Sequence, residues 1–172
     1  MTLLKFIDRL SEIKPHGNVF LEKFGIGHSK SILKEYLLTK KNIEKNPIFD
    51  NIIHELLVNY HVNNISFSDY SFNENIIEYN NVFVFGQSSG TYLAYETPDG
   101  KIIEYARDDD NLIDYCAENA DAFLEALLVI NEYRSNKFMN NLENNAKEVY
   151  VKRCCECAGG IKYEGFYRSI IR

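Results

Sequence analysis

The feature that most constrains the fold is a series of three strand-forming runs between residues 82 and 105, each separated from the next by a turn. Val82 to Phe85 is a continuous apolar run, which is typical of a strand buried on both faces. Thr91 to Glu96 and Ile102 to Tyr105 are the next two runs. A short polar loop forms the first connection and Pro98-Asp99-Gly100 forms the second, as tight turns require. The segment therefore predicts a β-meander.

Helical patterns lie on both sides of this meander. Asn119 can cap a helix whose first turn carries Asp121, and the apolar residues that follow recur at spacings of three and four. We therefore expect an α+β fold, with a mostly antiparallel central β-meander flanked by N-terminal and C-terminal helices. A break is expected near Ser135-Asn136. Further helices are expected at residues 1–13, 19–24, 29–38, 46–60, 142–158 and 163–171, and short strands at residues 65–67 and 76–79.

Length and charge limit the function classes. The 172 residues fit one domain, 1–172, in which 138–172 forms a helical C-terminal extension. The formal charge of −6 argues against direct nucleic-acid binding, which requires a basic surface, but it is compatible with a basic protein partner. Met1 to Ile13 is amphipathic and lacks the apolar core of a signal peptide, and no run of 18 apolar residues exists. We expect a cytoplasmic protein with reduced cysteines, no membrane contact, and a monomeric or weakly homodimeric state.

The order of motifs from the meander onward is distinctive. Phe85-Gly86 is followed by a polar loop, by Tyr92-Leu93-Ala94-Tyr95, by a turn, by an acidic run at residues 108–110, and by a helix that carries Phe123-Leu124. This order resembles the SMI1/KNR4 (SUKH) superfamily. The tail, with Ala158-Gly159-Gly160 before three aromatic residues, is similar to the ending of some bacterial members. The N-terminal Leu-Pro-x-x-Tyr segment typical of many members is absent.

This resemblance implies an immunity protein of a bacterial polymorphic or contact-dependent toxin system. Such a protein would bind a cognate toxin domain, often a nuclease, and occlude its active site. An acidic protein that faces a basic nuclease would also associate fast. The resemblance equally implies a second class, that of non-catalytic regulatory or scaffold proteins that bind partners other than toxins.

Acidic and aromatic residues in and after the meander are the candidates for partner contact. Acidic side chains steer a basic partner, and tyrosine is common at the centres of interfaces. By strand alternation, about half of Tyr92, Tyr95, Tyr105 and Tyr115 should face the core. The acidic run could instead be a solvated loop or could hold a cation, although its spacing is not that of a calcium-binding loop. The contact candidates are Asp108, Asp109, Asp110, Glu104, Tyr92 and Tyr105.

No pattern in the chain predicts catalysis or a cofactor. Gly86-Gln87-Ser88-Ser89-Gly90 has the spacing of a nucleophile elbow, which requires a turn from a strand to a helix. A strand follows here, so a small hydrolase with Ser88 as its nucleophile is only a remote alternative. The four histidines are interpreted as ordinary residues on helix surfaces or at helix ends, at positions 16, 28, 54 and 61.

The cysteines do not have the pattern of a metal site. Cys154, Cys155 and Cys157 form a single cluster, and Cys116 stands apart, whereas zinc sites commonly use two pairs of ligands. On a helix, residues 154 and 157 would share a face and residue 155 would point elsewhere. We expect buried, reduced thiols and no metal ion.

Overall fold

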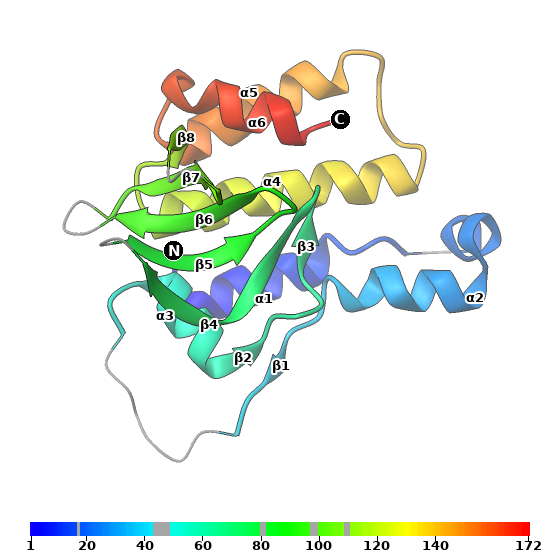
Figure 1. The fold of residues 1–172 in the computed structure, drawn as a ribbon. Helices are drawn as coiled ribbons and strands as arrows, with labels where there is room; N and C mark the ends of the chain where they lie inside the picture. The colour runs from blue at the N-terminus through cyan, green and yellow to red at the C-terminus, as the bar shows by residue number, and fades with distance from the viewer. Residues whose placement is uncertain (17, 43–48, 80–81, 97–99, 109–110) are drawn as a thin grey trace.

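The computed structural model describes residues 1–16, 18–42, 49–79, 82–96, 100–108 and 111–172. Its centre is a curled antiparallel sheet whose six strands follow chain order (Figure 1). A separate ribbon pairs β1 (Thr39–Lys40) with β2 (Tyr60–His61). The strands of the sheet are β3 (Ser66–Phe67), β4 (Tyr70–Tyr79), β5 (Val82–Gln87), β6 (Thr91–Glu96), β7 (Ile102–Ala106) and β8 (Leu112–Ala117).

Irregularities in strand pairing bend this sheet. The register shifts between β4 and β5, between β5 and β6, and twice between β7 and β8. Such bulges increase the local twist of a strand. Gly86 lies at the shift between β5 and β6, and a Cβ atom there would approach the carbonyl oxygen of Ser71 to 3.0 Å. Glycine therefore permits the close approach of β4 and β5.

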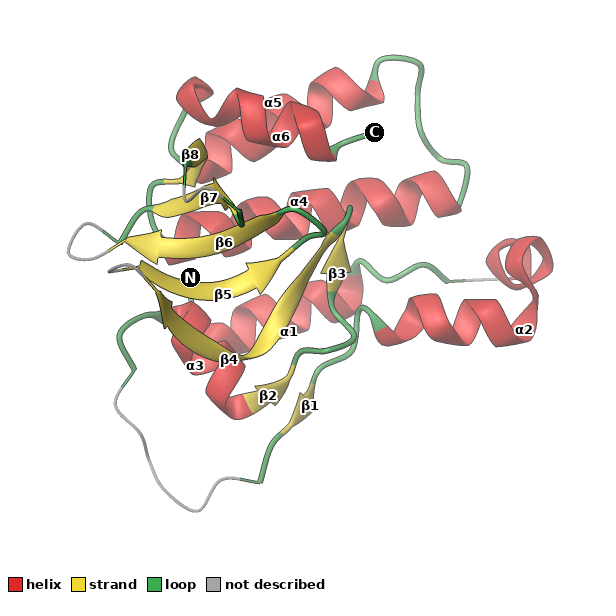
Figure 2. Cartoon of the chain, viewed as in Figure 1, coloured by secondary structure: helices red, strands yellow, loops and turns green. Residues whose placement is uncertain are grey.

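The helices pack around α4, which contacts α1, α3, α5, β3 and β8. In Figures 1 and 2 the helices α1, α3 and α4 lie together on one side of the sheet, and α5 and α6 lie beyond β8. No helix among the described residues is both long enough and apolar enough to span a membrane. The helices are α1 (Leu3–Glu12), α2 (Asn18–Lys34), α3 (Ile52–Asn59), α4 (Ala120–Phe138), α5 (Ala146–Ala158), the 3₁₀ turn η1 (Ile161–Tyr163) and α6 (Glu164–Ile170).

One apolar core connects these helices to the sheet. It extends from Leu3 of α1 to Ile171, so the segment 138–172 packs into the same core as the rest of the described chain. Phe123 of α4 is fully buried and meets Phe85 of β5 edge-on, with ring centroids 5.6 Å apart. Phe166 of α6 lies 6.5 Å from Phe123. The aromatic residues therefore connect the meander to the C-terminal helices.

The predicted α+β class and meander are confirmed. The runs at Val82, Thr91 and Ile102 begin β5, β6 and β7, and the strand predicted over 76–79 is the end of the longer β4. Asn119 caps α4 as predicted, since its side chain accepts a hydrogen bond from the backbone N–H of Ala122 at 2.9 Å. The residues at 97–99, which include most of the second predicted turn, lie outside the described part of the chain.

Three local predictions are wrong. The acidic segment was expected to lead directly into a helix, but β8 intervenes. No break occurs near Ser135, because α4 continues to Phe138 and the Ser135 side chain is buried. Ser29 does not begin a helix. It lies within α2, which kinks at Gly25, and its buried hydroxyl donates to the carbonyl oxygen of Phe20 at 3.5 Å.

Candidate partner-binding surface

Strand alternation gives the sheet two unequal faces. The inner face joins the main core, with Leu93 and Tyr95 of β6 among its buried residues. The opposite side, here called the outer face, carries a second and separate apolar cluster. All described members of this cluster belong to strands, so no described helix packs into it. They are the buried residues Val84, Ala94, Ile103 and Tyr105, together with the half-buried Val82 and Tyr92.

Three tyrosines converge on the outer face. Tyr92 of β6 and Tyr105 of β7 are register partners, and their ring centroids lie 5.7 Å apart. Tyr79, at the end of β4, lies 6.4 Å from each of them. Aromatic pairs at these distances attract each other beyond their buried area. The three rings therefore form a connected aromatic cluster across β4, β6 and β7, in which Tyr79 and Tyr92 are accessible and Tyr105 is buried beneath them.

Cationic side chains support this aromatic surface. The guanidinium of Arg107 lies over the Tyr92 ring at 4.9 Å and donates from Nη2 to Gln87 Oε1 at 2.6 Å. At the other side, the ammonium of Lys101 lies 5.9 Å from the ring centroid of Tyr115. These cation–π contacts restrain rings that would otherwise be free to rotate in solvent.

A row of paired residues crosses the outer face from edge to edge. In register order it runs Ile77, Val84, Ala94, Ile103 and Tyr115. The inner three are buried, whereas Ile77 is 56% exposed and Tyr115 is 39% exposed. The buried residues form the floor of the outer face, and the exposed side chains of Ile77 and Tyr115 at its two ends are the apolar groups that another molecule could contact. Exposed Leu112, opposite Tyr105 on β8, extends this surface.

The structure separates the predicted contact residues. Tyr92 is half-buried on the outer face, and Asp108 is exposed beyond the end of β7. Asp109 and Asp110 lie outside the described residues. The prediction that Glu104 contacts a partner is corrected, because its side chain lies on the inner face and is only 8% exposed. Tyr105 is also corrected: at 5% exposure it supports Tyr79 and Tyr92 and offers little surface of its own.

Sequence reasoning missed Ile77, Tyr79 and Leu112 as parts of this surface. Ile77 and Tyr79 alternate with charged Glu78 at the end of β4, which is the pattern of a strand with one apolar face. Of the tyrosines considered, Tyr95 faces the main core, whereas Tyr115 is exposed on the outer face. The alternation was visible in the sequence, but the side on which the helices lie was not.

Glu104 ends a buried chain of hydrogen bonds instead. The Tyr70 hydroxyl donates to Glu104 Oε1, and the Thr91 hydroxyl donates to the Tyr70 oxygen at 3.1 Å. Ser88 Oγ lies 2.8 Å from Thr91 Oγ1. Burial and the bond to Glu104 raise the pKa of Tyr70, so this hydroxyl stays protonated and donates. The chain of bonds links β4, β6, β7 and the loop between β5 and β6 beneath the outer face.

Ser88 does not occupy the setting that a nucleophile elbow needs. It lies between the antiparallel strands β5 and β6, where an elbow would lead into a helix. Its hydroxyl pairs with Thr91. Two of the histidines have contacts elsewhere: His54 Nδ1 lies 3.1 Å from Asp50 Oδ2, and the His28 ring packs on Phe24.

The cysteines pack in or beside the core. All four cysteines are free; Cys116, Cys154 and Cys155 are buried and Cys157 is partly exposed, so the prediction of buried, reduced thiols is confirmed for three of them. The Cys154 thiol lies 3.7 Å from the carbonyl oxygen of Ala126 on α4. Within the part of the chain that is described, no group of three or more potential ligand residues could hold a metal ion.

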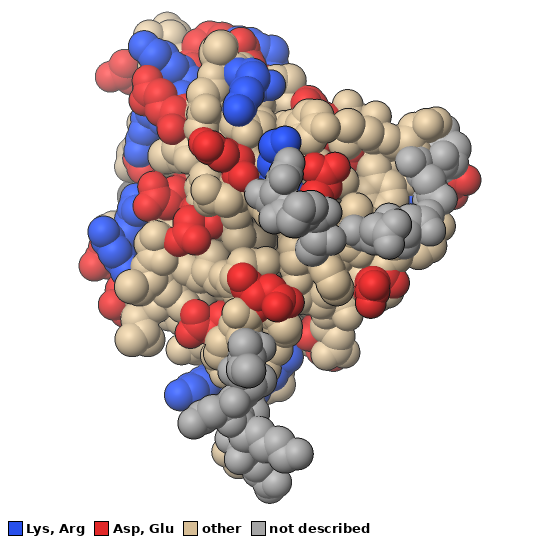
Figure 3. All heavy atoms as spheres, turned by 90° about the vertical axis from the view of Figure 1, so that its left-hand side faces the viewer, with Lys and Arg blue, Asp and Glu red and all other residues tan. Residues whose placement is uncertain are grey.

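Acidic groups lie at the end of the sheet where β4 and β6 finish. On the face shown in Figure 3, acidic side chains are spread across the middle, whereas most basic ones lie towards the upper and left margins. Glu78 lies next to the last residue of β4 and Glu96 is the last residue of β6, and both strand ends pair with Val82 at the start of β5. The end of the outer face therefore borders a region of negative potential.

Comparisons of this chain with protein-family models, with curated proteins and with solved structures find no match.

Proposed function

We propose that this chain is a non-catalytic binding protein that docks a basic partner protein on its outer face. The observation that carries this proposal is the apolar row between Ile77 and Tyr115, joined to the cluster of three tyrosines. Tyrosine supplies a large contact area at a small cost in conformational entropy, and it is common at the centres of interfaces.

The fixed geometry of the outer face supports this proposal. Val84 and Ile103 are buried and lie in central strands, so the floor of the surface is rigid. Arg107 holds the Tyr92 ring, and Tyr105 supports it from the neighbouring strand. A surface that is ordered before binding loses little freedom when the partner arrives.

Charge supports a basic partner. The chain carries a formal charge of −6. Glu96 and Asp108 lie at the margins of the outer face, where they would attract a cationic surface while apolar contacts form at the centre. We further propose that the partner is a bacterial toxin domain, as the resemblance to the SMI1/KNR4 superfamily implies, and that the chain neutralises it in the cytoplasm by occlusion.

Co-expression tests this function. The tagged chain would be produced together with an inactivated form of the protein encoded immediately upstream, and the complex would be isolated by affinity and size-exclusion chromatography. A stoichiometric complex, with rescue of growth when the active form is used, is the expected result. If that protein does not bind, the toxin assignment fails. A different bound protein, identified by untargeted affinity purification and dependent on Ile77, would favour the regulatory or scaffold class.

A further inference from the structure

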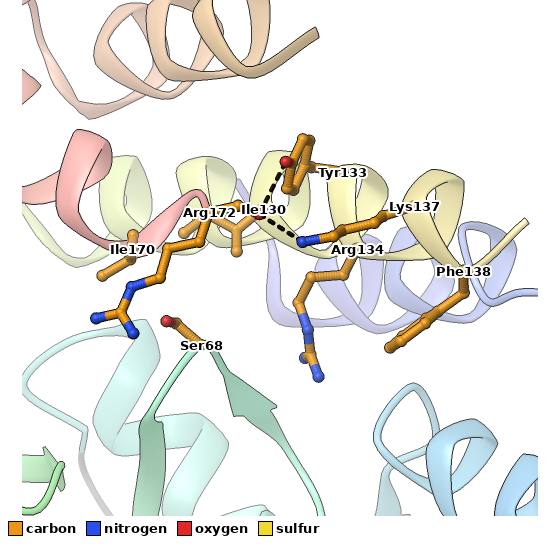
Figure 4. A pocket seen from close by; sticks show the side chains of 8 residues that line it. All are labelled: Ser68, Ile130, Tyr133, Arg134, Lys137, Phe138, Ile170 and Arg172. Atoms are coloured by element: carbon orange, nitrogen blue, oxygen red, sulfur yellow. Dashed lines mark hydrogen bonds between the residues drawn. The ribbon is translucent and has the colours of Figure 1, made fainter. Parts of the chain in front are cut away.

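The guanidinium of Arg107 differs from those of most arginines in this chain, because no carboxylate of a described residue balances its charge. Four arginines have a carboxylate oxygen within 3.1 Å of a guanidinium nitrogen: Arg134, Arg153, Arg168 and Arg172. Figure 4 shows two of these paired arginines, Arg134 on α4 and Arg172 after α6, beside one cavity. Arg107 makes no ion pair with another described residue, not even with the neighbouring Asp108, whose side chain is exposed.

Three contacts fix Arg107 on the outer face. Its backbone N–H donates to the carbonyl oxygen of Gly90 at 3.1 Å, and its Nη2 donates to Gln87 Oε1 at 2.6 Å. The guanidinium also lies over the Tyr92 ring, 4.9 Å from the centroid. Gln87 and Tyr92 are register partners on β5 and β6, so two neighbouring strands position this group. All of these partners are uncharged, so they order the guanidinium without neutralising it.

The Arg107 guanidinium keeps unused hydrogen-bond donors. Of its three nitrogens, only Nη2 has a partner among the described residues. Nε is fully buried and has no hydrogen-bond partner. The residue as a whole is half-buried, so its charge is partly withdrawn from water. A cation in this state is stabilised by an anion, and the planar guanidinium matches the two oxygens of a carboxylate.

The charge on the outer face changes sign along β6. Tyr92, on which Arg107 lies, is near the start of this strand, whereas Glu96 is its last residue and has the same side by strand alternation. Four residues of extended chain place these two positions about 13 Å apart. Glu96 makes no ion pair with another described residue. The outer face therefore carries a fixed cation at one end of β6 and a carboxylate at the other, with apolar side chains between them.

We propose that Arg107 binds the side-chain carboxylate of an aspartate or glutamate of the partner protein and thereby sets the orientation in which that partner docks. This inference rests on the proposed docking on the outer face. The partner that fits presents its carboxylate to Arg107 and a cationic group to Glu96, about 13 Å away along β6. A uniformly cationic surface fits less well, because it would place like charge beside a half-buried guanidinium. Arg107 thus discriminates among basic partners.

Two substitutions that remove the same charge test this inference by isothermal titration against the co-purified partner. Arg9 lies on α1, on the side of the sheet that the helices cover, and makes no ion pair with another described residue. Arg9→Gln and Arg107→Gln both make the chain more acidic, so long-range attraction alone would let both bind a basic partner at least as tightly as the parent does. We expect Arg107→Gln to bind about tenfold more weakly, since a charge-assisted pair is lost, and Arg9→Gln to show no loss. Urea unfolding of each variant checks that the fold is kept.

A double-mutant cycle identifies the carboxylate. Each aspartate and glutamate of the partner is replaced in turn by its amide, and one replacement should weaken binding to the parent but have no further effect on Arg107→Gln. Arg107→Lys, which keeps the charge and loses the planar fork, should retain part of the affinity. The inference is overturned if Arg107→Gln binds as tightly as Arg9→Gln, or if no partner carboxylate is coupled to Arg107. Docking on the outer face would survive both results, because Ile77→Ala tests it separately. If no protein binds the parent, the proposed function and this inference fail together.

Discussion

Tyr92 of β6 and Tyr105 of β7 stand directly opposite each other, with ring centroids 5.7 Å apart, on the side of the sheet that the described helices leave uncovered. On the inner face of the same two strands, Leu93 pairs with Glu104. One pair of strands therefore supplies both an aromatic outer surface and a buried polar chain of hydrogen bonds. This division explains why neighbouring residues differ so much in what they can contact.

The hydroxyl of Tyr70 should matter for stability. Tyr70→Phe would leave the buried Glu104 carboxylate without this donor and Thr91 without its acceptor. We expect the free energy of unfolding to fall by about 1–3 kcal/mol, the cost of unsatisfied buried groups. Tyr115→Phe, at an exposed position of β8, is the control and should change it little. Urea unfolding curves would measure both, and equal stability of the two variants would remove the hydrogen-bond chain from the account.

The Asn119 cap of α4 should contribute measurably to stability, whereas Asn145 at the start of α5 should not. Asn119 accepts a hydrogen bond from the Ala122 N–H, whereas Asn145, at the start of α5, makes no side-chain cap bond. Asn119→Ala should therefore lower the free energy of unfolding by about 1 kcal/mol. Asn145→Ala should leave it nearly unchanged. Thermal unfolding of both variants checks this, and a loss that is the same at both positions would contradict the assigned cap.

The end of α5 requires glycine. Gly159 has a φ of 109°, and a Cβ atom there would lie 2.5 Å from Glu118 Oε2. Gly159→Ala should destabilise the protein by about 1–2 kcal/mol or more, since the left-handed conformation alone has this cost. Gly27 lies within α2 and has open space around it, so Gly27→Ala should stabilise by about 0.5–1 kcal/mol. Chemical denaturation would reveal whether the two substitutions act in opposite directions.

The ion pair between Glu132 and Arg153 predicts a dependence on pH. Arg153 binds both carboxylate oxygens, at 2.9 and 2.7 Å, and this lowers the pKa of Glu132 below its usual value of 4.5. A carboxyl group whose pKa is lowered in the folded state stabilises the fold at pH values above its unfolded-state pKa. This stabilisation is lost as the pH falls through the folded-state pKa. Glu132→Gln should thus cost about 1 kcal/mol at neutral pH. The difference in free energy of unfolding between Glu132→Gln and the parent should disappear in acid. A difference that does not depend on pH would contradict the assigned role of this ion pair.

The order of the elements was largely predictable because local sequence patterns mark where most of them begin and end. The β5 to β7 runs are rich in strand-forming residues between clear turn signals, and Asn119 marks the start of α4. Strand β8 was missed because two bulges interrupt its pairing with β7 and Asp114 breaks its apolar pattern. Its existence depends on pairing with β7, which is a tertiary property.

The continuation of α4 beyond Ser135 also depends on distant contacts. Arg134 is held by Glu35 and by the carbonyl oxygen of Ser66, and the Tyr36 hydroxyl donates to the carbonyl oxygen of Asn131. These partners lie far from α4 in the sequence, so the pattern of residues within the helix could not predict their contacts. The burial of Glu104 was hidden for the same reason, because its hydrogen-bond donor, Tyr70, is on another strand.

The most direct test of the central proposal compares two isoleucines. Ile77 is 56% exposed on the outer face, and Ile161 is 70% exposed in η1, away from it. Isothermal titration against the co-purified partner would give the dissociation constant for the parent, Ile77→Ala and Ile161→Ala. We expect about tenfold weaker binding for Ile77→Ala, as for a residue within an interface, and unchanged binding for Ile161→Ala. Equal affinities for all three proteins would contradict docking on the outer face.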